Sequence, residues 1–231
     1  MKKIGLIGGM SWESTLLYYE LINKKVKAKL EGLHSANCVL ESVDFSEIAD
    51  LQKRNDWRGL ERIMIARAKL LEASGAELIL ICANTMHLCV EAIENSISVP
   101  IIHIAKATAE EINSYKLKRV ALLGTKFTME NDFFIEILAE KGIETLIPGP
   151  EDRELIHEII YKELVLGIFR KESSTKYLNI IKAMKKQGAE GIILGCTEIP
   201  LLIKSEDVDI PLFNTTKIHA EKAVEFAFLR D

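Results

Sequence analysis

Several features that would assign a protein to a specialised class are scarce in this sequence. Its 231 residues contain 4 cysteines, none in C-x-x-C spacing, and no apolar run is long enough to cross a bilayer. The net charge of −4 and the pI near 5.8 offer no basic surface for a nucleic-acid backbone. We therefore expect a cytoplasmic protein with reduced thiols, no membrane or nucleic-acid partner, and a small-molecule ligand.

The N-terminal residues MKKIGLIGGM place two lysines before an apolar stretch, as a signal peptide does. The stretch is broken at Gly8 and Gly9, the polar segment SWEST follows, and no A-x-A-type cleavage site is present, so a first strand is expected instead. The glycines lack the G-x-G-x-x-G spacing of a dinucleotide site, and no histidine shows metal-ligand spacing. The sequence predicts no metal and no cofactor.

Short aliphatic runs alternate with longer amphipathic segments along the chain. The runs KIGLIG, CVLESV, LILIC, RVALLG, GIILG and PLF are typical of buried strands. Helices are expected from Ser11, in the stretch ending at Gly75, around His87, over 151–166 and over 173–187. Gly75, Gly142 and Gly188 follow helix-like runs, where a left-handed cap is expected. This order favours an α/β fold with mostly parallel strands.

Three segments recur in the second half of the chain, in the same order. GAELILICANT at Gly75 matches GAEGIILGCTE at Gly188 at an offset of 113 residues, KIGLIGG at Lys3 matches RVALLGT at Arg119 at 116, and VPIIHIAKATAEE at Val99 matches IPLFNTTKIHAEK at Ile210 at 111. The shared order predicts two related α/β lobes. A single (β/α) barrel fits a two-fold repeat less directly.

Ligands of open parallel sheets bind beyond the carboxyl ends of the strands. A cleft is therefore expected between the lobes, lined by loops 8–11, 82–85, 124–128 and 195–198. The repeat pairs Ala83 with Cys196 and Cys82 with Gly195. Because adjacent strand residues point to opposite sides, we expect Ala83 and Cys196 to face the cleft and Cys82 to be a small buried residue.

The segments IGLIGGMSWEST, ANTMH, LLGT and GCTEIP resemble, in this order and over essentially the whole chain, the cofactor-independent aspartate/glutamate racemases, in particular their broad-specificity branch. The resemblance implies two pseudo-symmetric, three-layer α/β lobes, formed by 1–103 plus 211–231 and by 104–210, so that the final helix crosses back onto the first lobe. It also implies an amino acid held between the lobes and usually a homodimer. It also implies a chemistry without pyridoxal phosphate, in which one cysteine thiolate removes the Cα proton and a second thiol returns a proton from the opposite face. Thiols suit both roles because they titrate near neutral pH.

The first cysteine of that pair is missing. The family reads Cys-Asn-Thr where this sequence reads Ala83-Asn84-Thr85, whereas Cys196 remains in register. We assign proton transfer to Cys196 and mark Ala83 as the position of the missing first acid or base. Three explanations stay open: a natural one-thiol enzyme that uses water or Thr85, a local shift that lets Cys82 reach the substrate, or a substitution introduced to trap substrate.

The resemblance also implies which residues hold the substrate. Asn84, Thr85, Thr125 and Thr197 match the ligands of the α-carboxylate and ammonium groups, and Met10, Ser11 and Gln52 match cleft-lining positions. Each has a plainer alternative: Met10 packs, Ser11 caps its helix, and Gln52 is solvated. Glu198 either orients a thiol, holds the ammonium group, or caps the next helix. Candidates for the cation that a distal carboxylate requires are Lys53, Arg54, Lys126, Lys162 and Arg170.

The predicted activity is racemisation of aspartate, with glutamate as a second candidate substrate. One alternative is a one-cysteine decarboxylase or cis-trans isomerase of the same superfamily, and another is an amino-acid-binding protein without turnover. His87, Cys38 and Cys89 are expected to be packed core residues.

Overall fold

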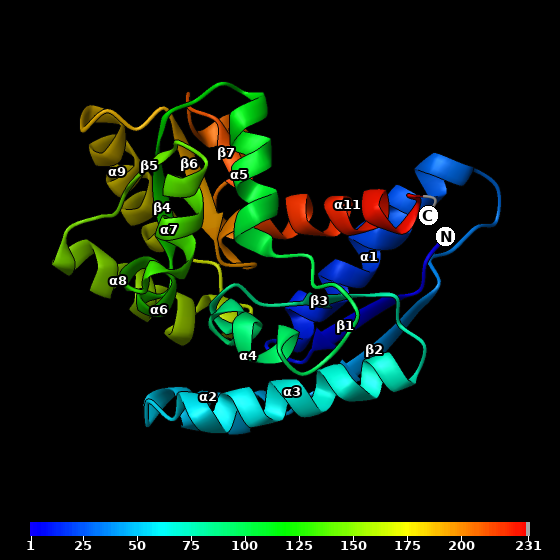
Figure 1. Ribbon diagram of the computed structural model, residues 1–231. Helices are drawn as coiled ribbons and strands as arrows, with labels where there is room; N and C mark the ends of the chain where they lie inside the picture. Colours follow the sequence, from blue (N-terminus) through cyan, green and yellow to red (C-terminus); the bar gives the residue numbers. More distant parts are fainter. Residues whose placement is uncertain (230–231) are drawn as a thin grey trace. The chain divides into compact units, whose positions relative to one another are not determined.

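The computed structural model describes residues 1–229, which form two compact units (Figure 1). The first unit comprises residues 1–103 and 219–229, and the second comprises residues 104–218. The second unit thus continues past residue 210, where the sequence placed the boundary, because the last strand pairs with the sheet of the second unit. No helix within residues 1–229 is long and apolar enough to span a membrane.

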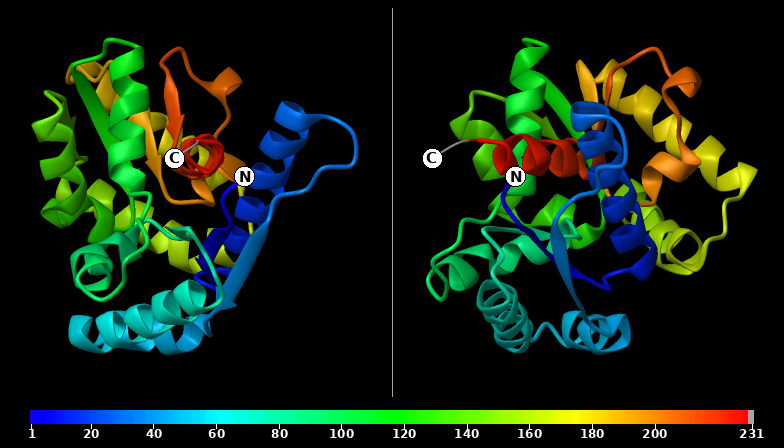
Figure 2. Two further views of the ribbon diagram at one scale, coloured as in Figure 1. Left: turned by 45° about the vertical axis from the view of Figure 1, so that its right-hand side comes forward. Right: turned by 90° about the vertical axis from the view of Figure 1, so that its right-hand side faces the viewer.

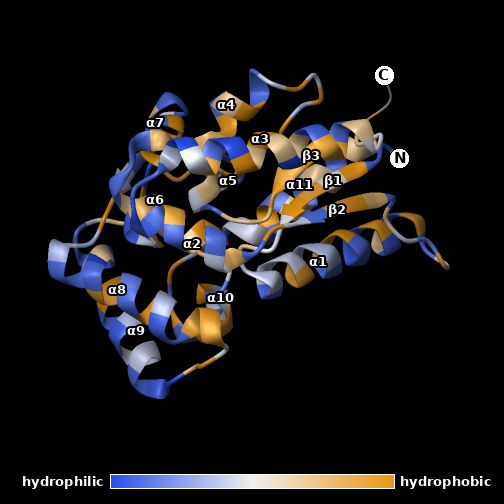
Figure 3. Ribbon diagram, turned by 90° about the horizontal axis from the view of Figure 1, so that it is seen from below, coloured by the Kyte–Doolittle hydropathy of each residue, from blue (hydrophilic) through white to orange (hydrophobic). Residues whose placement is uncertain are grey.

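The first unit is built on a parallel sheet in the order β2-β1-β3. Residue Ile101 extends this sheet through a single parallel bridge to Ile79. Figure 3 shows β1 and β3 in orange, as expected for strands that are covered on both faces. The elements of this unit are β1 (Ile4–Gly8), α1 (Trp12–Leu30), β2 (Cys38–Ser42), α2 (Phe45–Lys53), α3 (Trp57–Ala73), β3 (Leu78–Ile81), the 3-10 helix η1 (Thr85–Cys89), α4 (Val90–Glu94) and most of α11 (Thr215–Ala227).

Two apolar clusters cover the two faces of this sheet. One contains Tyr18 and Ile22 of α1 with Ala223 and Val224 of α11, and the other contains the apolar residues of α2, α3 and α4. Figure 2 shows α11 (red) beside α1 (blue), and the ion pair between Lys25 and Glu221 at 3.5 Å joins the two helices. The unit is therefore a three-layer α/β structure.

The second unit repeats this plan with a parallel sheet in the order β5-β4-β6-β7. Its single core cluster contains residues from all the longer helices of the unit. The elements are α5 (Ile104–Ser114), β4 (Arg119–Gly124), α6 (Lys126–Glu130), α7 (Asp132–Glu140), β5 (Glu144–Leu146), α8 (Pro150–Lys162), η2 (Leu164–Leu166), α9 (Lys171–Lys186), β6 (Gly191–Gly195), α10 (Ile199–Leu202), η3 (Ser205–Asp207) and β7 (Leu212–Asn214).

The sequence repeat corresponds to equivalent contacts in the two units. The backbone N–H of Lys3 donates to Oε2 of Glu77 at 2.6 Å, and that of Lys118 donates to Oε2 of Glu190 at 2.6 Å. The two glutamates of the repeated GAE segment thus fix the start of the neighbouring strand in each sheet. A second backbone contact recurs where the segment after each repeated strand joins the sheet. Ile79 N–H donates to Pro100 O, and Ile192 N–H donates to Pro211 O, both at 2.9 Å. Since the strands form two separate sheets, the barrel alternative is wrong.

Two expected helices are divided in the structure. The stretch before Gly75 is interrupted at Asn55, which has a φ of 56°, and Asp56 then caps α3 by accepting the Gly59 N–H at 2.9 Å. The segment around His87 forms η1 and the short α4. The glycines at 75, 142 and 188 have positive φ angles, as predicted for helix caps.

Candidate active site

The loop after β1 is held by a compact set of polar contacts. Gly9 has a φ of 92°, and a Cβ there would lie 2.1 Å from the Val43 carbonyl oxygen, so a side chain has no room. Its N–H donates to Oγ1 of Thr15 at 2.7 Å. Ser11 caps α1 by accepting the Ser14 N–H at 3.3 Å, and Met10 packs in the core. Ser11 therefore caps its helix and Met10 packs in the core, as the alternatives to a cleft-lining role state.

The two residues after β3 lie on opposite faces of the sheet. Cys82 is fully buried in the cluster formed with α1 and α11, whereas Ala83 belongs to the cluster on the other face. Burial raises the pKa of the Cys82 thiol, and the Cys82 carbonyl accepts the Ser14 hydroxyl at 2.7 Å. The prediction that Cys82 is a small buried residue is confirmed, and its position argues against the explanation in which Cys82 reaches a substrate.

Asn84 and Thr85 follow in a segment that His87 holds in place. His87 is 2% exposed, and its Nδ1 lies 2.9 Å from the Ala83 carbonyl oxygen and 3.2 Å from that of Asn84. Both partners are carbonyl oxygens, so a proton on Nδ1 satisfies both contacts. Gln52 is buried rather than solvated, and its Nε2 donates to Sδ of Met86 at 3.4 Å. Gln52 and Asn84 therefore belong to one strand-end region of the first unit.

A second histidine extends this support toward α11. His219 is fully buried, its Nε2 bonds the Ile102 carbonyl oxygen, and its Nδ1 accepts the Tyr18 hydroxyl at 2.7 Å. The His87 and His219 rings lie 5.4 Å apart. Desolvation lowers the pKa of His87 to about 4 and that of His219 to about 3. Both imidazoles are therefore neutral at pH 7, and His87 is a packed residue as predicted.

The two remaining cysteines of the first unit also pack against its cores. Cys89 is buried, and Cys38 is half-buried beside the apolar cluster that contains residues of α1 and α11. Burial raises the pKa of both thiols. Neither is in a disulfide.

In the second unit, the ends of β4 and β6 approach each other too closely for side chains. A Cβ on Gly124 would lie 2.9 Å from the Gly195 carbonyl oxygen, and one on Gly195 would lie 3.0 Å from the Leu123 carbonyl oxygen. Thr125 follows directly and accepts the Thr128 N–H at 3.2 Å. The close approach brings Thr125 and the Cys196 segment to the same end of the sheet.

Cys196 and Glu198 form the centre of this second-unit cluster. The Cys196 Sγ donates to Oε2 of Glu198 at 3.0 Å, and the Thr197 hydroxyl donates to the same oxygen at 2.6 Å. Glu198 is 6% exposed and makes no side-chain cap to α10, so its carboxyl group serves the thiol instead. Desolvation first, and then the Glu198 charge and hydrogen bond, raise the pKa of Cys196. The Cys196 side chain is therefore a thiol whose S–H donates to the Glu198 carboxyl group.

Two residues of α8 adjoin this cluster and were not found from the sequence. Tyr161 interacts electrostatically with Cys196 and Glu198, and burial raises its pKa to about 12. His157, one turn earlier, accepts the Lys126 backbone N–H at 3.3 Å, and its ring lies 4.7 Å from that of Tyr161. The spacing of four residues between His157 and Tyr161 is the sequence signal that both side chains lie on one face of a helix.

Three of the five candidate cations are held in ion pairs. Lys126 lies 2.7 Å from Glu154, Lys162 lies 2.5 Å from Glu158, and Arg170 lies 3.7 Å from Glu163. The other two, Lys53 and Arg54, are exposed at the end of α2. No group of three or more His, Cys, Asp or Glu in residues 1–229 is arranged to hold a metal ion.

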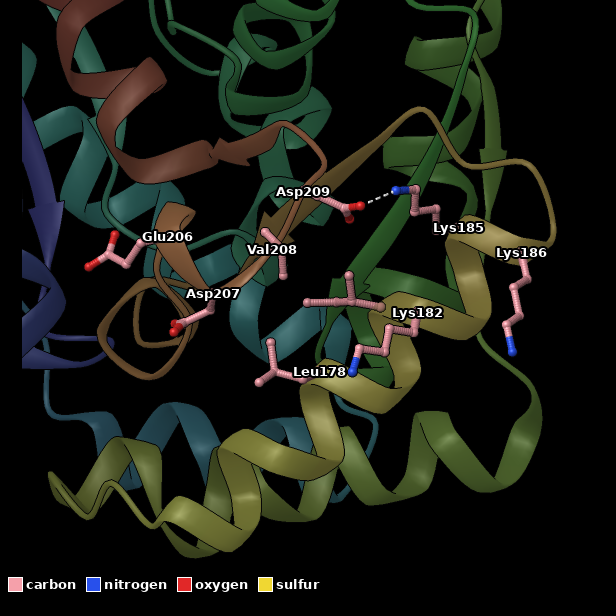
Figure 4. Close-up of a pocket in the computed structure, with 9 residues that line it drawn as sticks. Leu178, Lys182, Lys185, Lys186, Glu206, Asp207, Val208 and Asp209 are labelled. Carbon is pink, nitrogen blue, oxygen red and sulfur yellow. Dashed lines mark hydrogen bonds and ion pairs between the residues drawn. The ribbon is translucent and has the colours of Figure 1, made fainter.

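A groove on the surface of the second unit is lined by other residues than the predicted site (Figure 4). It has a volume of about 750 Å³, and Lys185 and Asp209 pair across it at 2.6 Å. These residues precede β6 and β7, away from the carboxyl strand ends that carry Thr125 and Cys196. The groove contains none of the predicted site residues.

Comparison with known proteins agrees with the α/β fold seen in each unit. The sequence model of the Asp/Glu/hydantoin racemases matches residues 7–223. The chain belongs to the Asp/Glu/hydantoin racemase family. A Yersinia pestis structure assigned to the Asp/Glu racemases is 48% identical, with a TM-score of 0.93 over 99% of this chain and 100% of that chain. PH1733, an aspartate racemase homologue from Pyrococcus horikoshii OT3, is 41% identical, with a TM-score of 0.86 over 98% and 99% of the two chains.

A curated relative is also named as a racemase. Broad specificity amino-acid racemase RacX of Bacillus subtilis (strain 168) is 22% identical over 231 residues, which is 96% of this chain and 96% of RacX. Membership in this racemase family makes the protein an isomerase and confirms the resemblance read from the sequence. Within the racemase fold, the structure groups the predicted residues into a first-unit set (Met10, Ser11, Gln52, Ala83, Asn84, Thr85) and a second-unit set (Thr125, Cys196, Thr197, Glu198).

Proposed function

We propose that the protein is a pyridoxal-phosphate-independent amino-acid racemase that acts on aspartate, with glutamate as a second substrate. The observation that carries the proposal is the thiol of Cys196, which donates to a buried Glu198 carboxyl group at 3.0 Å at the end of β6. A thiol with an adjacent proton acceptor can both lose and deliver a proton. In this proposal the first-unit and second-unit sets act on the same amino acid.

The proton transfers follow from the Cys196–Glu198 contact. The Cys196 proton moves to Oε2 of Glu198, and the thiolate then takes the Cα proton of the substrate. The electron pair left on Cα is delocalised into the α-carboxylate, so hydrogen-bond donors at that carboxylate stabilise it. Backbone N–H groups and hydroxyls of Asn84, Thr85, Thr125 and Thr197 supply these donors in the proposal. Protonation by the Cys196 thiol restores the original enantiomer.

Inversion needs a second donor on the opposite face, where Ala83 carries no titratable group. Water or the Thr85 hydroxyl takes this role in the proposal, and neither has a pKa near neutrality. Removal and return of the proton on the Cys196 face is therefore expected to be faster than inversion. Isotope exchange with retention of configuration should exceed racemisation.

The test uses both enantiomers of aspartate and glutamate in heavy water. Deuterium at Cα is measured by mass spectrometry, and configuration is measured by chiral chromatography on the same samples. Deuterium incorporation with slower inversion supports the proposal. Binding of the amino acids without either change supports the alternative of a receptor without turnover and contradicts the proposal.

Ala83 also favours a second candidate, a one-cysteine decarboxylase or cis-trans isomerase of the same superfamily. A decarboxylase replaces the departing carboxylate by a proton on one face only, so one thiol suffices, and this chain has one thiol in register. Release of carbon dioxide from aspartate or glutamate, without inversion, would favour the decarboxylase.

A further inference from the structure

The groove on the surface of the second unit lies between α9 and the segment that leads into β7 (Figure 4). Its volume of about 750 Å³ is in the range of pockets that hold small ligands. Leu178 and Ile181 of α9 and Val208 of the opposite segment give it an apolar lining. Ile181 belongs to the core, whereas Leu178 and Val208 are only half-buried. A ligand with an apolar body would therefore cover side chains that water now reaches.

The charged side chains of the groove are separated by sign along its length. Figure 4 shows Glu206 and Asp207 at one end and Lys186 at the other end. The apolar side chains of Leu178 and Val208 lie between the two ends. A complementary ligand therefore carries a positive charge at one end, an apolar body, and a negative charge at the other end.

Only one pair of charges in the groove is neutralised within the protein. Lys185 Nζ donates to Oδ2 of Asp209 at 2.6 Å, and this contact lowers the pKa of the Asp209 carboxyl group. Within residues 1–229, the side chains of Lys182, Lys186 and Glu206 form no ion pair. Lys182 and Lys186 lie on the same face of α9 because they are four residues apart. Two ammonium groups at the basic end and a carboxylate at the acidic end are thus available to a ligand.

The length of the groove along α9 fits a peptide of three residues. Leu178 and Lys186 are eight residues apart, which is about 12 Å along a helix. Three residues of an extended chain span about 10 Å, with the ammonium and carboxylate groups at opposite ends. The first and third side chains of such a chain point the same way, so both can contact the apolar lining. A single amino acid carries both charges on one carbon and cannot reach both ends of the groove.

We propose that this groove binds a short linear peptide with free termini and apolar side chains. The ammonium group of the peptide lies beside Glu206 and Asp207, and its apolar side chains cover Leu178. Its carboxylate lies beside Lys182 and Lys186. The groove contains none of the predicted site residues, so the proposal does not depend on which reaction the protein catalyses.

The test measures the Kd of leucyl-alanyl-leucine for the full chain by isothermal titration calorimetry. A Kd on the order of 0.1 mM is expected for a ligand of this size. The double variant Lys182→Glu/Lys186→Glu should raise Kd about tenfold, and Glu206→Lys should raise it about fivefold, because each reverses the charge at one end. Circular dichroism confirms that the variants fold. The matched control is Lys176→Glu, which changes an exposed lysine of α9 outside the groove and should bind as wild type.

Peptides blocked at one terminus test the orientation. The N-acetylated peptide lacks the ammonium group, so Glu206→Lys should not weaken its binding, whereas Lys182→Glu/Lys186→Glu should. The C-terminal amide of the same peptide should show the opposite pattern. A Kd above about 10 mM for the free peptide, or equal binding of free and blocked peptides, would overturn the proposal. Displacement of the peptide by L-aspartate, or an equal loss of binding in Lys176→Glu, would also overturn it.

Discussion

The buried histidines of the first unit predict a specific loss of stability in mild acid. His87 is neutral in the folded protein, with a pKa lowered by burial from 6.5 to about 4, and a pKa of about 3 applies to His219. The unfolded chain binds a proton at each histidine below about pH 6.5, whereas the folded protein does not. The free energy of unfolding therefore falls as the pH falls from 6.5, and the loss at His87 ends near pH 4, where the folded state also binds the proton.

The size of the effect follows from the difference in bound protons. Between pH 7 and pH 5, one such histidine lowers the free energy of unfolding by about 2 kcal/mol. A typical domain has only about 5–15 kcal/mol in total, so the loss is measurable. Carboxylates also begin to bind protons as the pH approaches 5, and comparing variants with the wild type cancels their contribution.

The variant His87→Asn removes the titrating ring and keeps an N–H close to the position of Nδ1, which bonds the Ala83 and Asn84 carbonyls. Urea unfolding followed by circular dichroism gives the free energy at pH 7, 6 and 5. The variant should lose about 2 kcal/mol less than wild type between pH 7 and 5. His34→Asn, at an exposed position, is the matched control and should follow the wild type. Parallel pH dependence in His87→Asn and wild type would refute the reasoning.

Three further predictions concern the strand ends. Ala83→Cys supplies a thiol at the missing position, so chiral chromatography should show inversion of aspartate rising by about 100-fold or more; no gain would exclude the missing acid as the limit on inversion. Glu198→Gln removes the charge that raises the pKa of Cys196 at 3.0 Å, so the midpoint of the pH profile for iodoacetamide alkylation should move to lower pH, and an unmoved midpoint would contradict the contact. Gly195→Ala places a Cβ 3.0 Å from the Leu123 carbonyl, so urea unfolding should show about 1–3 kcal/mol less stability, whereas Gly149→Ala, with no atom within 4 Å, should cost little.

Much of the fold could be predicted from the sequence because the strands show as short local apolar runs, and because three of these segments recur in the same order in the second half of the chain. Gly75 and Gly188 precede matching apolar strands, and the strands pair in the same order in both units. The break at Asn55 was missed because a helix-period pattern continues across it, and only the Asp56 cap reveals the start of α3. The short strand β5 was missed because Glu144–Leu146 has too few residues to show a period.

The candidate site could be predicted only in part. Cys82 and Ala83 were separated correctly because strand residues alternate between faces, which depends on backbone geometry alone. Gln52 was placed among the cleft-lining residues by resemblance alone, with solvation as the alternative, because its contact with Met86 joins residues 34 positions apart and leaves no local signal. Tyr161 and His157 were missed for the same reason: α8 meets the Cys196 segment through tertiary packing, which no local pattern encodes.

The role of Cys196 at the substrate is tested most directly by Cα deuterium incorporation into L-aspartate in heavy water, compared between wild type and Cys196→Ala. The account predicts incorporation by wild type and a loss of about 100-fold or more in Cys196→Ala, because no other thiol is in register to take the proton. Equal incorporation by the two proteins would contradict it.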